Sequence, residues 1–153
     1  MLKSIEIIQK PRVALFKLLD SLTIEQLNTV PAGFNNNIIW NFAHMVAAQQ
    51  GVCYLRAGLK TIITQDLYLA YKPETKPEKY VDADEFDHIK QLSISTLEQL
   101  DADYSAGLFN QYVPWTTRYG VELRNIDDAI SFLPFHDGLH TGYIMAQRRA
   151  LSV

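Results

Sequence analysis

The chain has 153 residues, 48% hydrophobic and 20% charged, a composition typical of one globular domain, here expected to span residues 1–153. Its net charge of −3 argues against a nucleic-acid partner, because nucleic-acid binding depends on cationic contacts with phosphates. No run of about 20 apolar residues is present, which argues against a membrane span, and the single cysteine, Cys53, excludes an intrachain disulfide and fits a cytoplasmic protein.

The first predicted element is an amphipathic helix from residue 4 to about residue 22, where apolar side chains recur every three or four positions. Ser4 is its expected N-cap. Pro11 lies within this segment, and because proline removes a helix hydrogen bond we expect either a kink there or a helix that begins near it. Residues 23–26 have the sequence of a capping box and predict a short helix, followed by a break at residues 30–34.

A second long helix is expected to begin at the asparagine cluster of residues 35–37, since asparagine is a good N-cap, and to end near Arg56, ahead of Gly58. Small and aromatic side chains form its predicted inward face. That face comprises Trp40, His44, Ala47, Gly51 and Tyr54 or Leu55. Cys53 lies off this face, and Trp40 is interpreted as a core residue rather than a platform for substrate.

Residues 58–84 are too many for an ordinary connection in a compact helical bundle, which takes about 2–8 residues. We expect a long crossover with a short helical turn at residues 64–68 and a mobile portion at residues 72–79. Its tyrosines are expected to cover one end of the bundle or an interface; they are Tyr68, Tyr71 and Tyr80. A further apolar stripe predicts the third long helix over residues 84–100.

Between residues 103 and 124 the periodicity changes. Residues 112–116 and 121–123 are rich in β-forming side chains and predict a short hairpin, which Pro114 limits to an edge. The last helix is expected to begin near residue 125, and Pro134 is expected to bend it. The chain therefore predicts an all-α fold of four long helices with a hairpin before the last one.

The histidines give the strongest functional signal. His136 and His140 are four residues apart on the inward stripe of the last helix, so they lie about 40° apart around its axis and can reach one metal ion. If the second and last helices are antiparallel, His44 lies within a few Å of the level of His140. His88 lies outside the apolar set of its helix and is expected at the surface. The prediction is a metal site formed by His44, His136 and His140.

Three neutral imidazoles favour zinc, nickel or another late transition metal over Mg²⁺ or Ca²⁺, and three protein ligands leave a position open for water. The order His136-Asp137-x-x-His140 invites comparison with His-Glu-x-x-His metalloproteases. Aspartate is one methylene shorter than glutamate, however, and no third ligand follows downstream, so we disfavour a protease. Asp137 is expected either to accept a hydrogen bond from a ligand imidazole or to be solvated. Thr141 and Tyr143 are interpreted as packing residues.

Three segments resemble the DinB-like family: the end of the first helix, the second-helix motif and the closing motif. They are Leu18-Leu19-Asp20-Ser21-Leu22-Thr23-Ile24-Glu25-Gln26-Leu27, Asn36-Asn37-Ile38-Ile39-Trp40-Asn41-Phe42-Ala43-His44 and His136-Asp137-Gly138-Leu139-His140-Thr141-Gly142-Tyr143-Ile144. The resemblance spans nearly the whole chain, although Asp137 stands where many relatives carry glutamate. It implies an up-down-down-up four-helix bundle, often dimeric, that binds nickel or zinc through His44, His136 and His140. Its characterised relatives include thiol-dependent enzymes, such as the mycothiol-dependent maleylpyruvate isomerase and bacillithiol transferases.

Three functions are open at this point. The first is an S-transferase, in which a low-molecular-weight thiol bound to the metal attacks an electrophilic small molecule. The second is metal-dependent hydrolysis of a small amide or ester, and the third is a non-catalytic metal-binding or assembly module. An open metal face in a pocket would favour the two enzymes, whereas a closed coordination sphere would favour the third. We expect a homodimer without nucleic-acid or membrane partners; the sequence assigns no catalytic residue.

Overall fold

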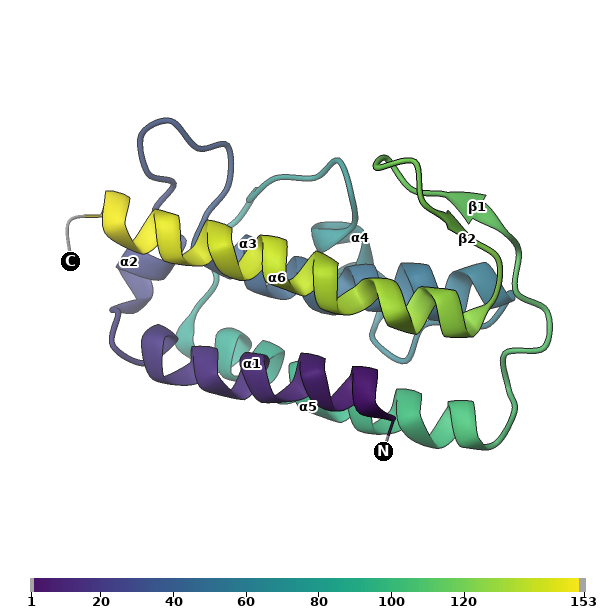
Figure 1. Ribbon diagram of the computed structural model, residues 1–153. Coiled ribbons are helices and arrows are strands. Elements are labelled where there is room, and N and C mark those ends of the chain that lie inside the picture. The colour runs from purple at the N-terminus through teal and green to yellow at the C-terminus, as the bar shows by residue number, and fades with distance from the viewer. Residues whose placement is uncertain (1, 152–153) are drawn as a thin grey trace.

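Long helices make up the body of the protein in a computed structural model that describes residues 2–151. In chain order the elements are α1 (Lys3–Leu19), α2 (Ile24–Asn28), α3 (Ile38–Gln49), the π-helix η1 (Gln50–Tyr54), the 3₁₀-helix η2 (Leu55–Ala57), α4 (Gln65–Tyr71), α5 (Ala83–Ser105), β1 (Trp115–Thr116), β2 (Glu122–Leu123) and α6 (Ile126–Ala150). Helices α1 and α3 each pack against both α5 and α6, and Figure 1 shows the β1–β2 hairpin beside the N-terminal end of α6. The prediction of an all-α protein with a short hairpin before the last helix is confirmed.

Polar side chains set where most of these helices begin. The side chain of Asn37 accepts a hydrogen bond from the backbone N–H of Trp40 at 2.8 Å, and Asn125 caps α6 in the same way. The predicted capping box at Thr23 is confirmed, since Thr23 and Gln26 bond reciprocally. The expected cap at Ser4 is wrong, because α1 already begins at Lys3.

Two helix ends lie away from their predicted positions, and a third agrees with the prediction. Helix α1 runs unbroken through Pro11, so a start near the proline is wrong, and it ends at Leu19 instead of residue 22. Helix α5 extends to Ser105, five residues beyond the predicted end. The second long helix does stop at Gly58, whose φ of 70° is the left-handed conformation that glycine adopts without strain.

The second long helix also changes its winding before it stops. After Gln49 the α3 hydrogen bonding gives way to the π-helical turn η1, in which each residue advances less around the axis than in an α-helix. Side chains beyond this point are therefore rotated relative to a 3.6-residue pattern. Cys53, expected off the inward face, is 0% exposed and packs in the hydrophobic cluster that also holds Leu97 and Leu133, so that expectation is wrong.

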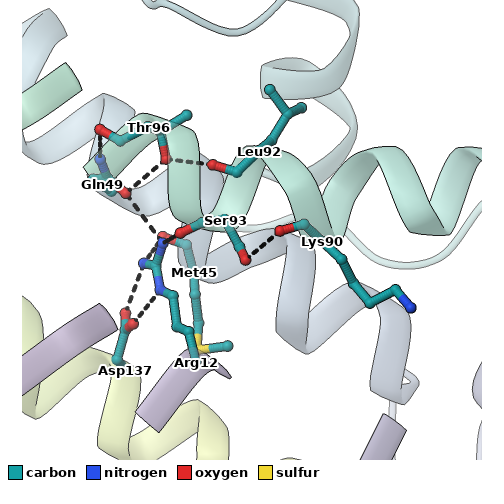
Figure 2. A network of polar contacts seen from close by, with 8 residues as sticks. All are labelled: Arg12, Met45, Gln49, Lys90, Leu92, Ser93, Thr96 and Asp137. Atoms are coloured by element: carbon teal, nitrogen blue, oxygen red, sulfur yellow. Dashed lines mark hydrogen bonds and ion pairs between the residues drawn. The ribbon is translucent and has the colours of Figure 1, made fainter. Parts of the chain in front are cut away.

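One arginine is buried in the middle of the bundle. Arg12 of α1 is 1% exposed, and Figure 2 shows its guanidinium between the other three long helices. Its Nε and Nη2 donate to the two carboxylate oxygens of Asp137 on α6, at 2.7 and 3.3 Å. The remaining donors reach the side chain of Gln49 and the backbone carbonyls of Met45 and Ser93, at 3.0–3.2 Å. Each nitrogen of this buried cation thus has an acceptor, as burial of a charge requires.

Asp137 therefore neither bonds an imidazole nor faces solvent, and both sequence-based expectations for it are wrong. Its carboxylate is turned toward α1, away from the histidines on either side of it in sequence, and is bonded by Arg12. Burial raises the pKa of the Asp137 carboxyl, and the Arg12 guanidinium opposes that rise. The pair holds α1 and α6 together at the turn of α6 that carries His136.

Among residues 2–151, no helix is both long and apolar enough to span a membrane.

Candidate metal centre

The first of the three histidines is placed by α3, every residue of which is buried. His44 is 5% exposed, and its Nδ1 lies 2.6 Å from the backbone carbonyl oxygen of Tyr71 in α4. A carbonyl oxygen only accepts, so Nδ1 carries the proton and Nε2 keeps its lone pair. The crossover predicted from residues 58–84 thus contributes to the site: its helix α4, longer than the predicted turn at residues 64–68, fixes the tautomer of His44.

The other two histidines lie one turn apart on α6, with ring centroids separated by 4.6 Å. The Nδ1 of His140 lies 2.9 Å from Oδ1 of Asn41 on α3. The amide nitrogen of Asn41 donates to Asn36 and Gln147, which leaves its oxygen as the acceptor facing the imidazole. His140 therefore also presents Nε2. The sequence alone did not assign this supporting role to Asn41. A signal was present, because Asn41 lies one helical turn before His44 and is a second polar side chain on a buried helix face, as expected of a residue that orients a metal ligand.

The three imidazole rings converge on one region between α3 and α6. Their nearest ligand nitrogens all lie within 4.8 Å of one another, and the ring centroid of His44 is 5.2 Å from that of His136 and 4.6 Å from that of His140. Within residues 2–151, His136 keeps a buried Nδ1 that has no hydrogen-bond partner. A buried polar atom without a partner is costly. Three converging imidazoles, one of them with an unsatisfied nitrogen, fit a late transition metal.

Burial also sets the protonation of these rings. It is the main cause that lowers the pKa of His44, and it lowers the pKa of His136 to about 2 and that of His140 to about 3. The neighbouring histidines contribute to the low pKa values of His136 and His140, and the positive charge of Arg118 is a smaller contribution that lowers the pKa of all three rings. The imidazoles are therefore neutral near pH 7, which is the form that binds a metal ion.

A pocket of about 1030 Å³ lies over the histidines and is lined by all three. Trp40 forms part of its wall with its ring stacked on that of His44, at a centroid distance of 4.6 Å. Trp40 is only 7% exposed, so the interpretation as core is correct, yet it also borders the pocket. Tyr143, interpreted as packing, is 45% exposed and lines the pocket as well. The volume is that of a site for a small molecule.

Other polar residues of the pocket carried no signal in the sequence analysis. Arg56, Glu74 and Arg118 all line it, and they come from η2, the crossover and the hairpin. Their positions depend on how these segments fold over the bundle, which local sequence does not encode. His88, in contrast, is exposed and lies outside the cluster, as expected.

Comparison with known protein families matches residues 8–144 to the DinB superfamily. No curated protein matches the chain. The family match covers most of the 153 residues and includes all three histidines, so this chain belongs to the DinB superfamily.

Proposed function

We propose that this DinB-superfamily protein is a metal-dependent enzyme in which His44, His136 and His140 hold one divalent transition metal, zinc or nickel. One observation carries the proposal: the ligand nitrogens of three imidazoles lie within 4.8 Å of one another at the wall of a pocket of about 1030 Å³. A structural site would be closed by a fourth protein ligand, and within residues 2–151 no further histidine, cysteine or carboxylate joins this cluster. The open side supports an enzyme over a non-catalytic module.

We further propose that the reactants are a low-molecular-weight thiol and an electrophilic small molecule, which makes the protein an S-transferase. The chemistry supplied by such a metal, when bound, is a lowered pKa for a coordinated thiol. The chain itself holds the imidazoles in place through Asn41 and the Tyr71 carbonyl, and the ring of Trp40 limits access of water to one side of His44. Hydrolysis of a small amide or ester is the alternative, and the Glu74 carboxylate in the pocket supports it as a group able to accept a proton from water.

Two finer features of the assembly are also proposals. We infer an up-down-down-up order for the four long helices; the packing of α1 and α3 against both α5 and α6 supports it, as does the direction of the colour gradient along each helix in Figure 1. We expect a homodimer, as the resemblance implies, and a mass measurement in solution tests this.

The metal assignment is tested by elemental analysis of the purified protein. We expect about one zinc or nickel per chain in the wild type, a large loss in a His44→Ala/His140→Ala variant, and no change in His88→Ala, whose side chain is exposed. Equal metal content in the wild type and the double variant would show that the metal lies elsewhere.

The thiol reaction is tested on protein loaded with Co²⁺. Addition of bacillithiol, glutathione or 2-mercaptoethanol should produce a sulfur-to-metal charge-transfer band, and the band should be absent in His136→Ala. Cys53 is fully buried in the hydrophobic cluster with Leu97 and Leu133, so it does not compete for this signal. An absorption spectrum that does not change on addition of any of the three thiols, but changes with pH near 7, would instead support a metal-bound water and the hydrolase.

A further inference from the structure

The short hairpin before α6 ends in a tightly held turn. Strands β1 and β2 are antiparallel, and the turn between them is closed by a hydrogen bond from the backbone N–H of Gly120 to the carbonyl of Thr117, at 2.9 Å. Gly120 has a φ of 77°, a conformation that favours glycine. Thr117 is 5% exposed, and its hydroxyl accepts from the N–H of Val121. Arg118 thus occupies the second position of a turn whose backbone is fixed on both sides.

Side chains of the hairpin also anchor it to the bundle. The ring of Tyr119 packs edge-on against Phe135 of α6, with centroids 5.1 Å apart. The guanidinium of Arg56 lies 4.6 Å from the centroid of the Trp115 ring, and Leu123 is buried. These contacts hold the turn above the pocket that the three histidines line.

Arg118 has no partner there. It lines the pocket together with the histidines, and within residues 2–151 its guanidinium makes no hydrogen bond or ion pair. Arg124, which follows the same hairpin, is instead paired with Asp128, with 3.5 Å between Nε and Oδ2. The backbone of the turn therefore places an arginine at the pocket while the planar set of N–H donors on its exposed guanidinium stays available to an anion.

The rest of the lining defines what kind of anion fits. Among the described residues that line the pocket, two arginines, Arg56 and Arg118, outnumber the one carboxylate, that of Glu74. Aromatic rings form much of the remaining wall, among them Trp40, Trp115 and Phe132. The planar pair of N–H donors on the guanidinium of Arg118 matches the two oxygens of a carboxylate.

We propose that the substrate of this site is an organic carboxylate with an apolar, aromatic body, and that Arg118 binds its carboxylate while its reacting group lies at the histidines. The position of the reacting group at the histidines rests on the proposed function, whereas binding of the carboxylate by Arg118 does not. Arg118 acts as a specificity-determining residue: it selects anionic over neutral molecules of the same shape.

The test compares a matched pair of probes, 3-phenylpropionate and 3-phenylpropanamide, by isothermal titration calorimetry. Both probes are titrated into the wild type and into Arg118→Gln, Arg118→Lys and Arg124→Gln. Each protein is measured in two states, once loaded with zinc and once after removal of metal with EDTA. Hydrogen bonds to a charged group contribute about 1.5–3 kcal/mol, so the wild type should bind the carboxylate about tenfold or more tightly than the amide. In Arg118→Gln the two affinities should become nearly equal, while Arg118→Lys retains part of the preference and Arg124→Gln all of it.

The two metal states separate this inference from the metal assignment. The preference belongs to Arg118, so it should persist after EDTA treatment even if no metal site exists. A preference that survives in Arg118→Gln, or one that disappears with the metal, would place the carboxylate elsewhere and overturn the inference. Absence of any preference in the wild type, including failure of both probes to bind at millimolar concentration, would also overturn it. Circular dichroism checks that Arg118→Gln is folded, which its exposed position predicts.

Discussion

Replacing Asp137 by asparagine should strongly destabilise the protein, because it removes the charge that compensates a buried cation. Asp137 is 5% exposed, Arg12 is 1% exposed, and two of the five contacts of the guanidinium go to this carboxylate. Asparagine has nearly the same shape, so the substitution leaves no cavity. Its oxygen can accept from Nε or from Nη2, but its amide group then turns two N–H donors toward the guanidinium.

The magnitude follows from the burial of the pair. Removing one partner of a buried ion pair costs about 3–5 kcal/mol. We expect about 3 kcal/mol for Asp137→Asn, since the carbonyls of Met45 and Ser93 and the side chain of Gln49 still accept from Arg12. A native domain has a total stability of about 5–15 kcal/mol, so this loss is large but leaves a folded protein to measure.

The assay is urea denaturation followed by circular dichroism, with Asp87→Asn as the control. Asp87 also carries an ion pair, to Lys90 at 2.7 Å, but its side chain is 62% exposed, and such a pair contributes about 0–1 kcal/mol. A double variant, Arg12→Met/Asp137→Leu, should recover much of the loss because it removes both charges from the interior. A cost below about 1 kcal/mol for Asp137→Asn would refute this reasoning, and would mean that the pair is not ionised.

Three further outcomes are expected. Asn41→Leu should weaken metal binding about 10–100-fold by releasing Nδ1 of His140, measured by competition with a chelator, and an unchanged affinity would exclude this role. The metal-free protein should lose stability as the pH falls below about 6.5, because the unfolded chain takes up protons on His136 and His140, whose pKa values in the folded protein are about 2 and about 3. By pH 5.5 each histidine should lower the free energy of unfolding by about 1.4 kcal/mol. A urea midpoint that stays constant between pH 7.5 and 5.5 would contradict this. Amide hydrogen exchange should be fast within residues 72–79, in contrast to α5, and uniformly slow exchange there would refute the mobility expected of that stretch.

The helices and the histidine set were accessible from the sequence because both depend on local spacing. Apolar residues three and four apart define a helix face, and two histidines four apart on such a face must point the same way. Asparagine and threonine caps are equally local, since each side chain bonds a backbone group three residues on. The third histidine of the cluster, His44, required only that two inward helix faces pack at one level.

Other features depend on contacts between segments far apart in the chain, so the sequence left them undetermined. Arg12 occupies an otherwise apolar stripe with Ile8 and Leu15, a visible anomaly, but its partner is 125 residues away, and only the packing of α1 on α6 shows that Asp137 faces it. Cys53 lies in a π-helical turn, which rotates side chains off the 3.6-residue pattern and which no composition signal marks.

The position of Arg118 likewise follows from where the hairpin docks. Its local sequence predicts a turn, and turns occur anywhere on a surface. Where a helix keeps its 3.6-residue winding, periodicity therefore determined which residues face inward. Tertiary packing decided which of them meet, because an inward direction is a property of one helix and a contact is a property of two.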